Sequence, residues 1–410
     1  MVPVFSGCGL VLASMVFRAS DVSGRTVPDV RYIAVDDLEE VNLFYYFVKS
    51  DRNPAEDPSC CGSPVDRLHR VSGLAYEIGP LAFDIENYEE EGCPVLVHRE
   101  ESWTRYTQLF SRVVLGFAVG VGFSYSTAAE ENEWSDTSAT RRLRAFIRKW
   151  LVDHPEFISN PLRLWRLVRW EDGAPRHPDD INGSDSLKSN HSSGNEAGVK
   201  PSSISRNVLM MGRRFPYSHG MGLISDELYE ETKESCGGDY VNPRNTKCIE
   251  CLNAVYKNWE RLEIQFTLGV YCDLKSPKPK QSAEYKFLAI KSWVGSIGEW
   301  NRCQKYIKAN YGFDVPSSVP YHLNVTSKGF RSLVYSGDHD LEINFMGTQA
   351  WIRSFNFSIV DDWRHWLLYT RAYANNLTFA TVKGAGHVVT EYKRKETWAM
   401  FERWIAGQAL

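Results

Sequence analysis

The chain has 410 residues, of which 43% are hydrophobic and 13% aromatic, enough apolar material to bury a large core. Its 47 basic and 51 acidic residues give a formal net charge of −4, so it has neither a nucleic-acid-binding basic surface nor an acidic tail. No run reaches the roughly 18 consecutive apolar residues that a membrane-spanning helix needs. We therefore expect a globular protein that binds neither nucleic acid nor a membrane.

The N-terminal residues 1–25 contain one apolar stretch, residues 8–17 (CGLVLASMVF), that resembles the core of a signal peptide. The basic residues that usually precede such a core are missing here. We interpret residues 1–25 as a degenerate signal segment and residues 26–410 as a single domain.

Residues 33–48 alternate apolar and polar side chains and then become solidly aromatic, which predicts a hairpin that enters a buried strand. Glycines interrupt the apolar runs at residues 73–84 and 120–126, which is typical of strands separated by loops. Residues 138–150 have apolar side chains at helical spacing and a basic opposite face, which predicts an amphipathic helix. Residues 172–206 are rich in Ser, Asn, Gly and Asp and have almost no large apolar side chains, so we expect a disordered insertion.

The second half of the chain begins with a helical, cysteine-bearing region, residues 215–285, which we interpret as a cap over a site. A tryptophan-rich helical stretch follows, and then two apolar strands are predicted at residues 331–336 and 377–382. An amphipathic helix over residues 395–405 ends the pattern. Helices that alternate with apolar strands predict an α/β fold with a mostly parallel central sheet.

Nine cysteines are many for a cytosolic enzyme and favour an oxidising compartment. Cys236 and Cys248 bracket the loop CGGDYVNPRNTKC, of the kind that a disulfide closes, and we expect them to pair. The alternative is that both are small buried apolar residues. Glycosylation motifs at Asn324, Asn356 and Asn376 agree with passage through the secretory pathway, although motifs this short also arise by chance.

Two polar groups in the last third of the chain each follow a predicted strand. One strand ends in Ser-Gly-Asp-His-Asp, which closes with Asp340, and 47 residues later the other ends in Lys-Gly-Ala-Gly-His, which closes with His387. The carboxyl ends of parallel strands form the ligand-binding edge of such sheets, so the two side chains can meet there. An acid followed by a histidine is the order of the last two triad members in α/β hydrolases. Asp340 would orient the imidazole, and His387 would act first as general base and then as general acid.

Further segments follow a family pattern: NLFYYFVKSDRNPAEDP, SGLAYEIGPLAF, VGVGFSYS, FIRKWLVDHPEFISNPL, HGMGLISDELYE, CGGDYVNP, YSGDHD, GTQAWI and KGAGH. Together they resemble plant serine carboxypeptidase-like proteins, particularly the branch that includes glucose-ester-dependent acyltransferases. The resemblance implies an α/β-hydrolase fold with a helical cap, a Ser-Asp-His triad, no cofactor, and secretion or vacuolar residence. It also implies carboxypeptidase or acyl-transfer chemistry on a small ester or peptide, through an acyl-enzyme. The family's acid and histidine map onto Asp340 and His387, whereas its serine maps onto no residue.

Three segments depart from the family pattern where that pattern places its oxyanion loop, a strand end and its serine. The family reads LLLWLTGGPGC where residues 59–67 read SCCGSPVDR, and FLDSP where residues 114–118 read VLGFA. It reads GDSYGG where residues 164–174 read LWRLVRWEDGA. No Gly-x-Ser-x-Gly motif occurs anywhere in the chain.

Codon degeneracy suggests a cause for these departures. Read one base later, codons for residues 164–174 can encode YGDSYGGKMVP, and codons for residues 114–118 can encode FLDSP. When each codon is instead read from the third base of the preceding residue's codon, codons for residues 59–67 can encode LLLWLTGGP. Trp165 and Trp170 have a single codon each, TGG. In the shifted frame the two G bases of each of these codons begin a glycine codon. We therefore interpret the three segments as compensated frameshifts, from gene decay, misjoined exons or sequence error.

The chain as written should have very low activity. Without a positioned serine no acyl-enzyme forms, and each lost oxyanion donor costs about 10²–10³-fold in rate. Ser124, in GVGFSYS, is the nearest substitute, but a turn residue after a glycine-rich loop is the better interpretation. Two classes of function remain: a serine carboxypeptidase-like hydrolase or acyltransferase, and an inactive relative that serves as a binding protein or is a decayed gene product.

Overall fold

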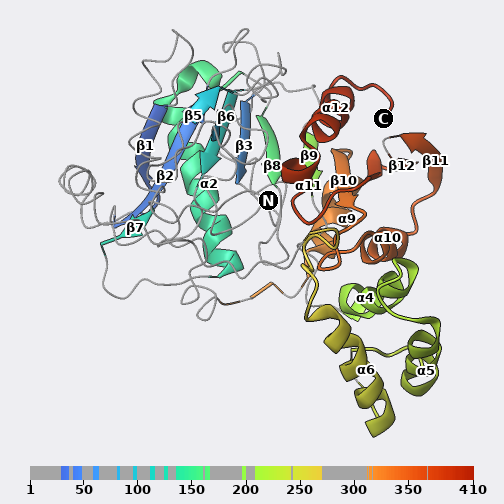
Figure 1. Cartoon of the computed structure of the whole chain (residues 1–410). Coiled ribbons are helices and arrows are strands. Elements are labelled where there is room, and N and C mark those ends of the chain that lie inside the picture. The colour runs from blue at the N-terminus through green and yellow to red at the C-terminus, as the bar shows by residue number, and fades with distance from the viewer. Residues whose placement is uncertain are drawn as a thin grey trace. The chain divides into compact units, whose positions relative to one another are not determined.

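The computed structural model describes part of the chain. The described residues are 29–36, 40–48, 59–63, 81–83, 96–98, 111–115, 124–127, 135–159, 162–166, 196–199, 208–241, 243–269, 312, 314–315, 317–366 and 368–410. The chain divides into two compact units, residues 1–165 with 273–312 and residues 166–272 with 313–410, each of which is described by itself (Figure 1).

The first unit is built on the hairpin that the sequence predicts. Its elements are β1 (Asp29–Ala34), β2 (Val41–Val48), β3 (Ser59–Ser63), β4 (Leu81–Phe83), β5 (Leu96–His98), β6 (Ser111–Leu115), β7 (Tyr125–Ser126), α2 (Asp136–Asp153), η3 (Pro155–Phe157) and β8 (Leu162–Arg166). In the main sheet the strands follow one another in the order β1, β2, β6, β3, β8. β1, β6 and β7 pair antiparallel with β2, and β3 pairs parallel with β6. β4 and β5 form a separate antiparallel pair.

Helix α2 packs its apolar face on the hairpin. Tyr45 of β2 meets Phe146 edge to face with ring centroids 5.2 Å apart, and Phe47 meets Trp150 in the same way at 5.1 Å. All four rings are buried, so they contribute both apolar burial and favourable ring geometry. The amphipathic helix predicted over residues 138–150 is confirmed.

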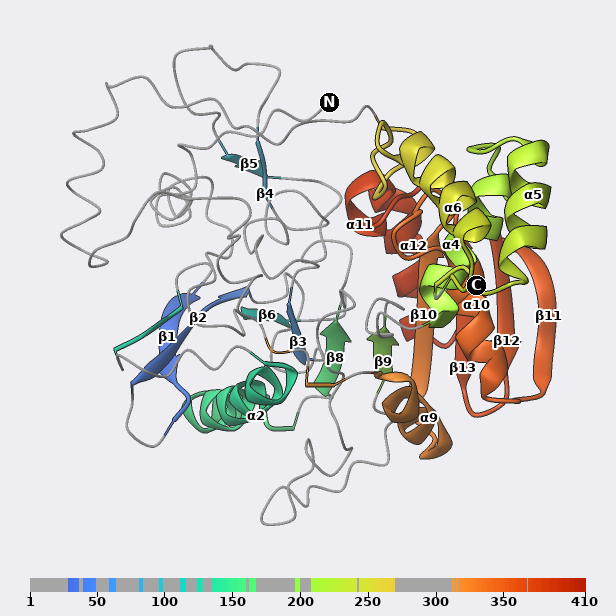
Figure 2. The same ribbon diagram turned by 90° about the horizontal axis from the view of Figure 1, so that it is seen from below.

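The second unit contains the strands and helices of the C-terminal half. They are α4 (Val208–Gly220), α5 (Asp226–Cys236), α6 (Thr246–Trp259), α9 (Val319–Ser327), α10 (Phe345–Ser354), α11 (Val389–Tyr392), α12 (Arg394–Ile405), β9 (Glu196–Val199), β10 (Arg331–Gly337), β11 (Ile359–Trp366), β12 (Leu368–Tyr373) and β13 (Leu377–Val382). The strands lie in the order β9, β10, β13, β12, β11, as Figure 2 shows. β10 pairs parallel with both neighbours, whereas β12 and β11 are antiparallel.

The two predicted strands of this unit are β10 and β13, and both are central. Six of the seven residues of β10 and five of the six of β13 are buried. Strands that are covered on both faces need continuous apolar runs, which explains why their sequences do not alternate. Val334 of β10, Phe379 of β13 and Trp351 of α10 belong to one buried core cluster.

Strand β9 lies within the segment 172–206, and the disordered insertion expected there stays a prediction. Residues 196–199 pair parallel with β10 from Arg331 to Val334. The rest of the segment, and the signal-like residues 1–25, lie outside the described residues.

Helices α4, α5 and α6 form a helical group within the region that the sequence predicts as a cap (Figure 1). α4 packs against α10 and α5, and α5 packs against α6. Gly237 ends α5 with a left-handed φ of 57°, and Gly238 follows with φ 86°. These two angles explain the Gly-Gly pair, because residues with side chains rarely adopt them.

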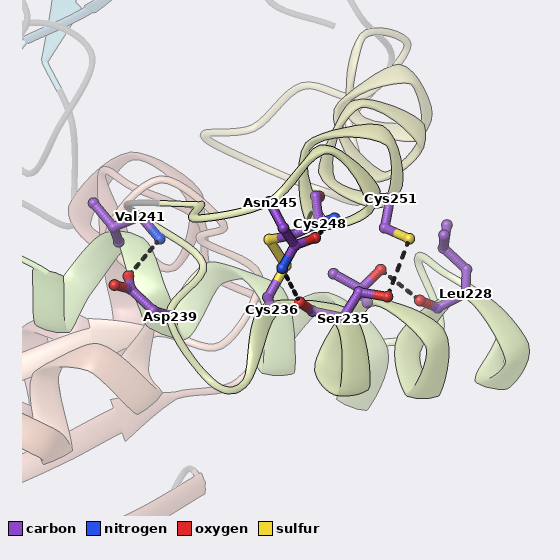
Figure 3. The surroundings of a disulfide bond; sticks show 9 residues. Leu228, Ser235, Cys236, Asp239, Val241, Asn245, Cys248 and Cys251 are labelled. Carbon is purple, nitrogen blue, oxygen red and sulfur yellow. Dashed lines mark hydrogen bonds between the residues drawn. A yellow bond between two sulfur atoms is a disulfide. The ribbon is translucent and has the colours of Figure 1, made fainter.

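A disulfide joins α5 to α6 in this group (Figure 3). It links Cys236, the last residue of α5, to Cys248 in the first turn of α6. Asn245 reinforces the link, because its Oδ1 caps α6 by accepting the backbone N–H of Cys248 at 2.8 Å. Its Nδ2 also donates to the carbonyl of Ser235 at 2.9 Å.

Removing this disulfide should lower stability by about 2–3 kcal/mol, because the cross-link restricts the unfolded chain over a short loop. We expect reductant to lower the urea midpoint of the wild-type chain and to leave the Cys236→Ala/Cys248→Ala variant unchanged. Cys251 is buried and free, so Cys251→Ala is a matched control that should keep the response to reductant. A wild-type chain whose midpoint ignores reductant would contradict this expectation.

Candidate active site

Two loops follow the adjacent parallel strands β10 and β13. The strands pair in register up to their last residues, Gly337 and Val382, so both end at the same edge of the sheet. The acid loop, residues 338–344, follows β10, and the histidine loop, residues 383–388, follows β13. The acid loop and the histidine loop therefore begin next to each other at this edge of the sheet.

Asp340 and His387 are in direct contact. Asp340 Oδ2 lies 2.9 Å from His387 Nδ1, and the two side chains are 0% and 2% exposed. Because an ionised carboxylate can only accept, Nδ1 is the donor of this hydrogen bond. The second carboxylate oxygen, Oδ1, accepts the backbone N–H of Ile343 at 2.8 Å. A carboxylate fixed in this way holds the imidazole in one orientation.

Backbone contacts tie the acid loop to the histidine loop. The N–H of His339 donates to the carbonyl of Ala385 at 2.9 Å, and the N–H of Gly384 donates to Asp338 Oδ1 at 2.7 Å. A Cβ atom at Gly337 would collide with the carbonyl of Ala385. The glycines of the two motifs therefore allow the close approach that the Asp340–His387 contact requires.

The other ring nitrogen of His387, Nε2, is buried and has no hydrogen-bond partner within the part of the chain that the structure describes. Leaving a buried polar atom unsatisfied costs about 1–3 kcal/mol. Nε2 is also the atom through which a histidine base would meet the hydroxyl that it deprotonates. The His387 backbone N–H donates to the carbonyl of Gln265 at 2.6 Å, a contact that no sequence motif marks and that the sequence analysis missed.

A buried tyrosine lies beside the acid loop. Tyr217 of α4 donates its hydroxyl to the carbonyl of Asp338 at 2.6 Å. Burial, together with the negative charge of Asp340, raises the pKa of Tyr217 well above its ordinary value. The phenol therefore stays neutral and remains a hydrogen-bond donor to the loop.

The three departing segments each start in a strand of the first unit, or at its end. Residues 59–63 form β3, residues 114–115 end β6 and residues 164–166 end β8, whereas the rest of each segment lies outside the described residues. Ser124 is 3% exposed, and its Oγ accepts the backbone N–H of Phe44 at 2.7 Å. This contact fits the structural role that the sequence analysis prefers for Ser124.

The three glycosylation motifs occupy different surroundings. Asn324 lies in α9, where the hydroxyl of Thr326 is buried and donates to the carbonyl of His322 at 2.8 Å. Asn356 and Asn376 are exposed and have left-handed φ angles of 53° and 57°. Glycosylation at these three positions stays a prediction.

The described residues contain no arrangement typical of a metal site or of a membrane span. No group of three or more His, Cys, Asp or Glu side chains in this part of the chain is arranged to hold a metal ion. None of its helices combines the length and the apolarity needed to cross a bilayer.

Comparisons with known proteins give the family. A model of the serine carboxypeptidase family matches residues 29–165 and 203–407 of the chain. The chain belongs to the serine carboxypeptidase family. Among curated relatives, the serine carboxypeptidase-like proteins 2, 7 and 11 of Arabidopsis thaliana are each 40% identical to it. Each match spans 92% of this chain. The match covers 89% of the length of protein 2 and 90% of the length of proteins 7 and 11.

A solved structure supports the α/β-hydrolase fold of this serine carboxypeptidase family member. The prohormone-processing carboxypeptidase Kex1(Δ)p of Saccharomyces cerevisiae matches with a TM-score of 0.67 over 96% of this chain and 94% of that chain. The sequence identity is 14%, so this likeness concerns the fold. The family match omits residues 166–202, which include most of the segment where the sequence analysis expects the missing serine.

Proposed function

We propose that Asp340 and His387 are the acid and the base of a serine carboxypeptidase-like active site. The observation that supports this most directly is the buried contact between Asp340 Oδ2 and His387 Nδ1 at 2.9 Å. The unsatisfied Nε2 of His387 adds support, because a nucleophilic hydroxyl would complete its hydrogen bonding. His387 would take the proton of that hydroxyl, and Asp340 would stabilise the imidazolium that results.

The reaction we propose is acyl transfer from a small ester or a peptide through an acyl-enzyme. His387, once protonated, would return its proton to the leaving group, and in the second half it would activate water or an acceptor hydroxyl. Of the two acceptors we favour the hydroxyl, and therefore transfer from a glucose ester, because the sequence resembles the acyltransferase branch. The disulfide favours an oxidising compartment, so we place the protein in the secretory pathway, extracellular or vacuolar.

We further propose that the chain as written is catalytically impaired. It has an acid and a base but no recognisable nucleophilic serine, and its glycine-rich oxyanion loop is replaced. Transcript sequencing tests the frameshift hypothesis directly, since codons incompatible with GDSYGG beneath residues 164–174 would rule it out. An inactive relative that binds ligands through the same site is the competing function.

Labelling with a fluorophosphonate distinguishes these functions. We define the frame-restored chain as this chain with LLLWLTGGP at residues 59–67, FLDSP at 114–118 and YGDSYGGKMVP at 164–174. We expect no labelling of the chain as written, because only an activated serine reacts, and clear labelling of the frame-restored chain.

Two controls make the labelling specific. Labelling of the frame-restored chain should disappear when the serine of GDSYGG is replaced by alanine. It should also fall steeply in His387→Ala, because the serine then lacks its base. A frame-restored chain that folds but is never labelled would reject the proposed active site and favour the binding protein.

A further inference from the structure

Residues 264–267 (Ile-Gln-Phe-Thr) contact both the acid loop and the histidine loop, although they belong to neither. This clasp segment follows helix α6 of the predicted cap. On the side of the acid loop, the carbonyl of Ile264 accepts the backbone N–H groups of Leu341 and Glu342, both at 3.0 Å. One carbonyl therefore holds the two residues that come directly after Asp340.

On the opposite side the clasp segment holds the histidine loop. The carbonyl of Gln265 accepts the backbone N–H of His387 at 2.6 Å. The neighbouring Gly386 lies so close that a Cβ atom there would collide with this carbonyl. Phe266 stacks on Tyr392 of α11 with ring centroids 4.1 Å apart. The clasp segment therefore lies in close contact with the histidine loop at Gly386 and His387.

Side chains add a second set of contacts to the acid loop. Gln265 Nε2 donates to Glu342 Oε2 at 2.8 Å, and the carboxylate belongs to a residue that is only 7% exposed. Thr267 donates its backbone N–H to the carbonyl of His339 at 3.0 Å, and its hydroxyl lies 3.1 Å from His339 Nδ1. Gln265 is thus bonded through its backbone to one loop and through its side chain to the other.

We propose that Gln265 is a positioning residue for the Asp340–His387 pair, which it serves by fixing the separation of the two loops. This inference rests on the proposed function of the pair. Gln265 bonds to His387 only through the backbone and touches no reacting atom. A displacement of about 1 Å in a catalytic group can cost about 10²-fold in rate, so small movements of the clasp segment matter.

Exchanging the side chains of Gln265 and Glu342 distinguishes a positioning role of their hydrogen bond from a general packing role. Gln265→Glu places a second carboxylate against Glu342, and the repulsion should push the clasp segment away from the acid loop. The double variant Gln265→Glu/Glu342→Gln restores one amide and one carboxylate with their roles exchanged. Gln408→Glu, which adds the same charge at an exposed position near the C-terminus, is the matched control.

Two measurements report on the result. In the full chain as written, we expect the proton between His387 Nδ1 and Asp340 to give a downfield proton resonance, and its loss in His387→Gln would assign it. We expect this resonance to be lost in Gln265→Glu, to return in the double variant and to persist in Gln408→Glu. In the frame-restored chain, kcat should fall by about 10²-fold in Gln265→Glu with little change in KM, and should recover in the double variant.

The outcomes separate this inference from the proposed function. An unchanged resonance and kcat in Gln265→Glu would overturn the positioning role while the labelled serine still supported the active site. A resonance that the double variant fails to restore would also overturn it, because the loss would then reflect general damage. If the frame-restored chain is never labelled but the resonance follows the swap, the proposed function fails and Gln265 still positions the pair.

Discussion

Replacing Asp340 by asparagine should lower kcat of the frame-restored chain by about 10⁴-fold. The two side chains have the same shape, so the backbone N–H of Ile343 keeps an acceptor. An amide facing His387 Nδ1 as donor would, however, favour the imidazole tautomer with its proton on Nε2, which cannot accept the serine proton. Burial should increase the loss of kcat, because the Asp340 side chain is 0% exposed and bulk water does not reach Nδ1 to replace the missing carboxylate oxygen.

The measurement is steady-state hydrolysis of a small ester by the purified variant. Asp362→Asn is the matched control, because Asp362 lies on β11, is exposed and pairs with Arg371. That variant should keep kcat within about twofold of the parent, as surface substitutions usually do. An Asp340→Asn variant that retained a tenth of the parent's kcat would refute the assigned role of Asp340.

The second large effect concerns pH-dependent stability and the buried His322. His322 lies in α9 and is buried, and this burial lowers its pKa from the ordinary 6.5 to about 4. Between pH 6.5 and about 4, the unfolded chain binds a proton at this residue and the folded chain does not. Its contribution to stability is therefore fully present above pH 6.5 and is lost as the pH falls towards 4. The total loss is about 3 kcal/mol, from roughly 1.4 kcal/mol for each pH unit.

Urea titrations at pH 7 and pH 4.5 test this expectation. His322 stacks on Trp351 with ring centroids 5.2 Å apart, so His322→Phe keeps a ring in place and removes the titration. We expect this variant to lose less stability on acidification than the wild type. His365→Phe, at an exposed position of β11, should keep the wild-type slope. Equal slopes in wild type and His322→Phe would contradict the prediction.

Sequence patterns were sufficient to predict that Asp340 and His387 lie together, because both follow apolar strands with glycines at the turn. β10 and β13 are adjacent and parallel, so a rule about strand ends placed Asp340 near His387 across 47 residues. The hairpin and the helix α2 were equally readable, because their apolar periods match their secondary structure.

Other features depend on contacts that no local pattern records. Strand β9 pairs with the backbone of β10, and its sequence Glu-Ala-Gly-Val carries no strand signal of its own. Gln265 bonds the histidine loop through a carbonyl, a group that every residue has, so its identity could not reveal the contact. Only the assembled structure brings residue 265 to residues 342 and 387.

The route of the chain between β10 and β13 has a consequence for how this family can vary. After the acid loop the chain leaves through α10, builds β11 and β12 at the outer edge of the sheet, and returns to pair β13 directly with β10. Exposed residues of the β11–β12 hairpin, such as Val360, should therefore be exchangeable without altering the spacing between the strands that precede the acid and the histidine loops. Evolution can remodel that outer edge while the inner pair of strands keeps its geometry.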